Sequence, residues 1–122
     1  MKKILIVEDE MALLKVYVML FGMQNFEVHE ASNGKIALDL LDKINPDIIV
    51  LDILMPVMGG LEFLEVSQVK IKNPKTKILV LSNLSDPETL NRIKELGADK
   101  YLLKASVSPG KLVTAVNELL TV

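Results

Sequence analysis

Short apolar runs alternate along the chain with longer segments in which apolar positions recur every three or four residues. The runs at residues 4–7, 48–51 and 78–81 consist almost entirely of β-branched residues and leucine, which is typical of strands covered on both faces. The runs at residues 28–31 and 101–103 mix apolar and polar residues, as expected for strands nearer the edge of a sheet. The pattern therefore predicts five strands.

The intervening segments predict five helices. They cover residues 11–24, 35–43, 61–71, 86–96 and 109–120. The sequence SDPE at residues 85–88 predicts a capping box with Ser85 as the cap and an early proline, and Ser108 before a proline repeats the start pattern at the last helix. Gly97 suits the left-handed conformation that ends a helix.

The alternation of strands and helices predicts an α/β protein with a parallel sheet and helices on both faces. In such sheets, ligands bind beyond the carboxyl ends of the strands, where the strand order reverses. The sequence shows no linker, internal repeat or low-complexity tract, so we expect one domain over residues 1–122.

Composition limits the classes of function. Half of the 122 residues are apolar and a quarter are charged, with a formal net charge of −2, so the chain lacks the basic surface typical of direct nucleic-acid binding. The absence of cysteine excludes disulfides and thiolate metal sites and agrees with a cytoplasmic location. Lys2 and Lys3 before an apolar run resemble the start of a signal peptide, but residues 4–7 are too few for one. No segment approaches the roughly 20 apolar residues of a membrane span, so we expect no membrane partner.

Acidic, hydroxyl and ammonium side chains follow the predicted strands at their carboxyl ends. In chain order they are Glu8, Asp9 and Glu10 after the first strand, Asp52 after the third, Ser82 at the end of the fourth and Lys104 after the fifth. These ends share one edge of a parallel sheet, so the side chains are expected to converge there. Two carboxylates about 4 Å apart repel by about 4 kcal/mol at an effective dielectric constant of about 20, so the acids require protonation or a cation. Mg²⁺ is the natural candidate, because it binds one or two carboxylates together with water and phosphate oxygens.

Each of these residues also has a simpler interpretation. Glu8 and Asp9 fit solvated loop acids or favourable charges at the start of a helix, and Asp52 fits a cap or turn residue. Ser82 fits a backbone-bonded hydroxyl and Lys104 a solvated surface cation. Together these interpretations require four coincidences at one edge, which favours a common site.

The loop after Asp52 supports that site. Pro56 cannot continue a hydrogen-bonded ladder, and Gly59 and Gly60 permit backbone turns that other residues resist. The segment therefore predicts a tight loop that exposes the Asp52 side chain at the edge of the sheet.

Four segments resemble the receiver domain of bacterial two-component response regulators. They are ILIVEDE at residues 4–10, DILMPVMGG at residues 52–60, LVLSN at residues 79–83 and KYLLKA at residues 100–105. The resemblance covers essentially the whole chain and implies a flavodoxin-like, doubly wound fold with strand order 2-1-3-4-5, five helices and three layers. It implies either a stand-alone receiver, as in chemotaxis and phosphorelay proteins, or the front of a longer regulator.

The resemblance also implies a phosphoryl-accepting switch. Asp52 would take a phosphoryl group from a sensor histidine kinase or a histidine phosphotransfer protein. Asp9, Asp52 and the backbone carbonyl of Leu54 would ligate Mg²⁺, with Mn²⁺ as an alternative ion and Glu8 acting through water. Lys104 would pair with a phosphoryl oxygen. Such a chain catalyses only its own phosphorylation and dephosphorylation, so we do not expect an enzyme acting on other substrates.

A conformational response is implied as well. Ser82 would move to donate a hydrogen bond to a phosphoryl oxygen, and Tyr101 would turn inward to fill the vacated space. These movements would bias a surface formed by residues 86–96, 101–103 and 109–120 toward a downstream protein or output domain. We expect a monomer or a weak, phosphorylation-dependent dimer.

Several positions depart from the family pattern. The family usually has a proline after the lysine, joined by a cis bond, whereas Ala105 follows Lys104 here. A cis bond without proline costs about 3–4 kcal/mol, so the bond is either cis and strained or trans with Lys104 aimed differently; we favour cis. Asn83, Leu54 and Leu84 occupy positions that tune the access of water to the acyl phosphate, and the two leucines predict slow self-dephosphorylation.

The first helix is unusually apolar. From Met11 to Met23, only Lys15 is charged, whereas a surface helix normally has a polar outer face. Burial against the sheet and a neighbouring helix is one explanation. The other is a docking surface for the helical bundle of a kinase.

Other classes of function fit less well. A phosphatase of the haloacid dehalogenase type needs a second aspartate two residues after the nucleophile, where this chain has Leu54. A flavin or nucleotide carrier needs an anion-binding loop after the first strand, where the acids at residues 8–10 would repel phosphate. A degenerate receiver that binds partners without phosphorylation stays the main alternative, with Ala105 as its only support.

Overall fold

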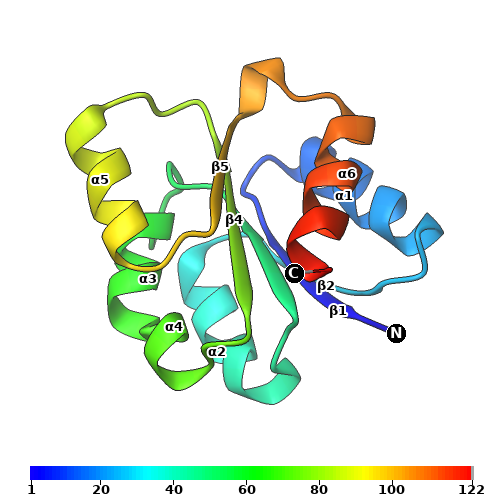
Figure 1. Ribbon diagram of the computed structural model, residues 1–122, viewed down its shortest axis with the longest axis horizontal. Coiled ribbons are helices and arrows are strands. Elements are labelled where there is room, and N and C mark those ends of the chain that lie inside the picture. Colours follow the sequence, from blue (N-terminus) through cyan, green and yellow to red (C-terminus); the bar gives the residue numbers. More distant parts are fainter. Residues whose placement is uncertain (122) are drawn as a thin grey trace.

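The computed structural model describes residues 1–121 and contains one parallel sheet between two layers of helices (Figure 1). The strands are β1 (Lys3–Val7), β2 (Glu27–Ala31), β3 (Ile48–Leu51), β4 (Lys77–Ser82) and β5 (Lys100–Leu103). Their order in the sheet is β2-β1-β3-β4-β5, and every neighbouring pair is parallel. The expected flavodoxin-like α/β fold is therefore confirmed.

The helices cover both faces of this sheet. They are α1 (Met11–Met23), α2 (Gly34–Ile44), α3 (Gly60–Ser67), α4 (Val69–Lys72), α5 (Pro87–Glu95) and α6 (Pro109–Leu120), with a short 3-10 helix, η1, at Lys104–Ser106. Helices α1 and α6 pack on one face, and α2 to α5 pack on the other (Figure 1). Strands β1, β3 and β4 are almost wholly buried, whereas β2 and β5 form the edges and are partly exposed, as the sequence predicts.

The third predicted helix is divided at Gln68. The pattern predicts one helix over residues 61–71, but Gln68 is left-handed, with φ 49°, and separates α3 from α4. The break turns Val69 into the core, where it is 1% exposed, and directs Lys70 toward Asp99, 2.7 Å away. These tertiary contacts override the local helical period.

The capping predictions are partly confirmed. Ser108 caps α6, with its hydroxyl accepting a hydrogen bond from the N–H of Lys111. Gly97 is left-handed at φ 104°, and a Cβ there would collide with the side chain of Lys70. The predicted capping box at residues 85–88 is wrong, because the cap of α5 is Asp86, whose carboxylate accepts from the N–H of Thr89. Aspartate is as good a cap as serine, so the sequence alone does not decide between neighbours.

Candidate functional site

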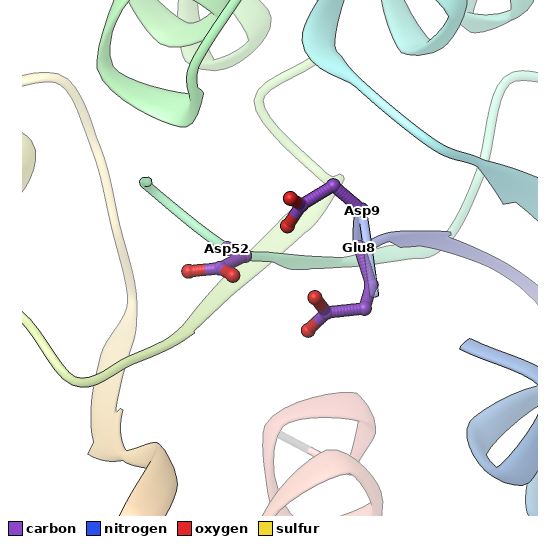
Figure 2. Close-up of side chains that lie close together, drawn as sticks. All are labelled: Glu8, Asp9 and Asp52. Atoms are coloured by element: carbon purple, nitrogen blue, oxygen red, sulfur yellow. The ribbon is translucent and has the colours of Figure 1, made fainter. Parts of the chain in front are cut away.

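Three carboxylates meet at the carboxyl edge of the sheet. The β1–β3 ladder pairs Val7 with Leu51, so the residues that follow them, Glu8 and Asp52, leave adjacent strands side by side. One carboxylate oxygen from each of Glu8, Asp9 and Asp52 lies within 4.8 Å of the other two. Figure 2 shows the side chains of Glu8 and Asp9 directed from the end of β1 toward Asp52. The predicted convergence of these acids is what the structure shows.

Lys104 enters this cluster from the end of β5. Its ammonium lies 2.7 Å from the Glu8 carboxylate and donates a hydrogen bond of 3.0 Å to Oδ2 of Asp52. A third acid, Glu10, is 3.9 Å from the same ammonium and is exposed. Burial disfavours the charged amine, but the hydrogen bonds to Glu8 and Asp52 outweigh it and raise the pKa of Lys104. The lysine is therefore a permanent cation between two acids.

Glu8 is the most deeply buried of the three acids. Its side chain accepts the N–H of Glu10 at 3.1 Å, and the residue is only 2% exposed. Burial raises the pKa of the Glu8 carboxyl, and the hydrogen bond from Lys104 only partly opposes this effect. Two acids share one lysine here, so the cluster has an excess of negative charge and favours a further cation.

The Asp52 side chain is fixed at both oxygens. Oδ1 accepts the N–H of Ile53 at 2.7 Å, and Oδ2 accepts from Lys104. Asp52 is only 6% exposed, so the expectation of an exposed side chain is wrong: the carboxylate lies at the carboxyl edge of the sheet but is largely buried. The tight loop that follows is confirmed: a Cβ at Gly60 would collide with the carbonyl of Asp52, so glycine is needed there for close approach.

The left-handed position of the same loop is unexpected. It falls on Val57, with φ 70°, rather than on a glycine. Valine is β-branched and rarely adopts this conformation, and the Val57 side chain is 80% exposed, so no burial compensates. The loop beside Asp52 is therefore strained.

Ser82 and Tyr101 meet at the carboxyl end of β4. Ser82 is the last residue of β4 and is 1% exposed. Its hydroxyl oxygen accepts a hydrogen bond of 3.4 Å from the backbone N–H of Leu84. The hydroxyl of Tyr101 lies 2.9 Å from the carbonyl oxygen of Ser82 and also contacts the carbonyl of Leu84. Burial raises the pKa of the Tyr101 phenol. Tyr101 thus already contacts the loop that carries Ser82, whereas the movement of either residue stays a prediction.

The Lys104–Ala105 bond is trans, so the expectation of a cis bond is wrong: residues 1–121 contain no cis peptide bond. Ala105, unlike proline, has an N–H, and Oδ1 of Asn83 accepts it at 2.7 Å. The backbone then forms a turn of 3-10 helix from Lys104 to Ser106. Although the bond is trans, Lys104 still reaches Asp52. The sequence suggests only that Asn83 affects the access of water to the acyl phosphate, and it does not predict the hydrogen bond between Asn83 and Ala105.

Leu54 and Leu84 differ in how far they are exposed to solvent. Leu54 is 62% exposed on the loop after Asp52, and Leu84 is partly buried behind Ser82. A metal contact from the backbone carbonyl of Leu54 stays a prediction.

Helix α1 is buried on one side only. Its buried residues, Leu14, Tyr17 and Phe21, face the sheet. Its exposed apolar residues, which we call the α1 stripe, are Met11, Val16, Met19 and Met23, between 49% and 78% exposed. Burial therefore explains part of the apolar character of this helix and leaves the stripe unexplained.

A doubly wound five-stranded sheet with an acid cluster and a lysine at its carboxyl edge defines a class of phosphoryl-accepting signalling domains. The family model described as response regulator receiver domain matches residues 4–117. The chain belongs to this family.

Similar proteins with curated descriptions are regulators. The transcriptional regulatory protein YdfI of Bacillus subtilis is 38% identical over 110 residues, which cover 88% of this chain and 50% of that protein. The transcriptional regulatory protein SrrA of Staphylococcus aureus is 35% identical over 120 residues, which cover 97% of this chain and 47% of that protein. The chain spans about half the length of these relatives.

Solved structures of receiver proteins are also similar to this chain. The chemotaxis protein CheY4 of Vibrio cholerae superimposes with a TM-score of 0.88 at 30% identity, covering 98% of this chain and 99% of that one. A CheY-like receiver domain from Methanospirillum hungatei superimposes with a TM-score of 0.92 at 27% identity, covering 99% of this chain and 94% of that one.

Within residues 1–121, no helix has the length and apolar character needed to span a bilayer.

Proposed function

We propose that Asp52 is the residue that accepts the phosphoryl group in this receiver domain. The observation that carries the proposal is the position of Lys104, whose ammonium donates to Oδ2 of Asp52 at 3.0 Å inside a cluster of acids. The Lys104 ammonium is therefore close to the place where negative charge accumulates during transfer of a phosphoryl group to Asp52. Glu8 has the same two kinds of partner, with the N–H of Glu10 on Oε2 and Lys104 on Oε1, but it is more deeply buried than Asp52, at 2% exposed against 6%.

The donor is a phosphohistidine on a sensor kinase or a phosphotransfer protein. A carboxylate oxygen of Asp52 attacks the phosphorus while the nitrogen–phosphorus bond of the donor breaks, and the leaving imidazole takes up a proton. The product on this chain is an acyl phosphate. Positioning and electrostatics supply most of the catalysis in such transfers, and the hydrogen bonds that hold Asp52 contribute to the positioning.

The acid cluster fits a divalent metal. Three carboxylates with oxygens within 4.8 Å of one another form the hard oxygen donor set that Mg²⁺ prefers, and Mn²⁺ accepts the same ligands. Asp9 and Asp52 would bind it directly, Glu8 through water and Leu54 through its carbonyl. When bound, the ion supplies positive charge that offsets the charge of the phosphoryl oxygens.

The remaining roles belong to side chains already at the site. Lys104 holds one phosphoryl oxygen as a compact point charge once it leaves Glu8. Ser82 donates to another oxygen, and Tyr101 follows the Ser82 loop through its contacts with the carbonyls of residues 82 and 84. The surface formed by α5, β5 and α6 then changes its preference for a downstream protein or output domain. The chain acts on its own acyl phosphate and on no other substrate.

Incubation with acetyl phosphate and Mg²⁺, followed by intact mass measurement, tests the proposal. We expect one phosphoryl group on the wild type and on the control Asp39→Asn, which changes an exposed acid of α2, and none on Asp52→Asn. Omitting the metal should abolish the reaction. A wild type that gains no mass would favour the degenerate receiver instead.

A further inference from the structure

A side chain joins the two loops that carry the site. Oδ1 of Asn83 accepts the backbone N–H of Ala105 at 2.7 Å. Asn83 directly follows Ser82, and Ala105 directly follows Lys104. The ladder between β4 and β5 ends at the pair Ser82 and Leu103, so this hydrogen bond links the strands just beyond their last paired residues.

The link acts on the backbone that holds Lys104. The N–H of Ala105 belongs to the same planar peptide unit as the carbonyl of Lys104, so a hydrogen bond to one fixes the orientation of the other. That orientation sets the direction in which the Lys104 side chain leaves the chain. The far end of the side chain is held separately, by Glu8 at 2.7 Å and Asp52 at 3.0 Å.

The contact depends on both residues. A proline at position 105 has no N–H to donate, and a small apolar residue at position 83 has no oxygen to accept. Both side chains are exposed, so no hydrophobic packing replaces the hydrogen bond if one partner is changed. Asn83 itself forms no contact with Asp52 or with the acid cluster among the hydrogen bonds of residues 1–121.

We propose that Asn83 is a positioning residue for phosphoryl transfer: its hydrogen bond to the N–H of Ala105 aims Lys104 at Asp52 and fixes the spacing between Lys104 and Ser82. The inference rests on the proposed function, since it assigns Asn83 a role in that same reaction. It also explains how a receiver with alanine after the lysine keeps its lysine at the site with a trans bond.

Four variants test the pair. Asn83→Ala removes the acceptor, Asn83→Asp keeps an acceptor oxygen, Ala105→Pro removes the donor, and the double variant Asn83→Ala/Ala105→Pro removes both. Asn91→Ala, an exposed asparagine of α5, is the matched control. The measured quantity is the rate constant of phosphorylation by saturating acetyl phosphate with Mg²⁺, read by intact mass.

We expect Asn83→Ala to slow phosphorylation about fivefold, the effect of losing one hydrogen bond that acts on the reaction. Asn83→Asp and Asn91→Ala should react at the wild-type rate. The double variant should be no slower than the slower single variant, because both changes break one contact. Stabilisation of the fold by Mg²⁺ should be unchanged in Asn83→Ala, since the acid cluster is intact. A purely structural role would weaken metal binding and phosphorylation together.

Two results overturn the inference alone: a wild type that is phosphorylated at the same rate as Asn83→Ala, or an Asn83→Asp variant as slow as Asn83→Ala. If Ala105→Pro does not fold, the comparison of the alanine and aspartate variants at position 83 decides. A wild type that accepts no phosphoryl group overturns the proposed function and this inference with it.

Discussion

The ammonium of Lys104 lies 2.7 Å from the carboxylate of Glu8, closer than the 3.0 Å that separates it from Asp52. The lysine is therefore shared, and in the absence of metal it is the cation that offsets the repulsion between these acids. A divalent ion bound at the cluster would offset part of the same repulsion. The stability of the fold and the binding of metal should consequently depend on each other.

Lys104→Met should expose this dependence. The variant leaves the buried acids Glu8 and Asp52 without their cation and should lose about 3 kcal/mol of unfolding free energy in EDTA. Mg²⁺ should restore more stability to the variant than to the wild type, as measured by urea unfolding in both conditions. Lys35→Met, which removes an exposed pair with Asp39, should change stability by only about 0.3 kcal/mol. Equal gains from Mg²⁺ in Lys104→Met and wild type would contradict the shared role.

The leucines beside the site should control the lifetime of the acyl phosphate. Leu54→Asn/Leu84→Asn should shorten it by about threefold to tenfold, because polar side chains admit and orient the attacking water. The lifetime is read from the loss of phosphorylated mass after removal of the donor. Val66→Asn, at an exposed apolar position of α3, is the control and should leave it unchanged. An unaltered lifetime in the double variant would remove the assigned role of these leucines.

The α1 stripe should be a contact surface for the phosphodonor protein. Met19→Glu, at a residue 68% exposed, should slow phosphotransfer from the cognate kinase about tenfold, the effect of burying a charge in an apolar contact. Phosphorylation by acetyl phosphate should be unaffected, because this small donor needs no docking surface. Ile71→Glu, at a residue 77% exposed on α4 on the opposite face, is the control. Equal slowing with both donors would count against docking at α1.

The strained loop predicts a stabilising substitution. Val57→Gly should raise the unfolding free energy by about 1 kcal/mol, because glycine adopts φ 70° without steric cost. Val66→Gly, in the interior of α3, should lower it by about the same amount. Chemical denaturation of both variants measures the two changes in unfolding free energy, which should have opposite signs. A loss of stability in Val57→Gly would show that the valine is not strained.

The cap of α5 should make stability depend on pH. Hydrogen bonds from the side chain and the backbone N–H of Thr89 lower the pKa of Asp86 below 3.8. A lowered pKa in the folded state contributes stability above pH 3.8 that is lost as the pH falls through the folded value. Wild type should therefore melt at a higher temperature than Asp86→Asn at pH 7, with the difference shrinking below pH 3.8. A difference in melting temperature that stays constant as the pH falls below 3.8 would contradict this role of the cap.

Much of the architecture could be predicted because it follows local periodicity. Buried parallel strands are continuous apolar runs, so β1, β3 and β4 are recognisable without a structure. The site follows from the rule that the carboxyl ends of parallel strands share an edge, which places Glu8, Asp52 and Lys104 together.

Two of the errors arise where a distant contact decides the local backbone. Gln68 becomes left-handed because Val69 is buried in the core and Lys70 bonds to Asp99, which lies 31 positions beyond Gln68 in the sequence. The trans bond after Lys104 is accompanied by a contact from Asn83, 22 residues earlier in the chain. No window of local sequence contains either pair.

The placement of the helices has one further consequence. Helix α1 lies on one side of the sheet and α5 on the other (Figure 1). The acid cluster lies at the carboxyl edge of the sheet between these two layers. A donor seated on α1 and a recipient of the signal seated on α5 would occupy separate territory. If both surfaces are used in this way, the two proteins could bind at the same time, and the signal would pass to the recipient before the donor dissociates.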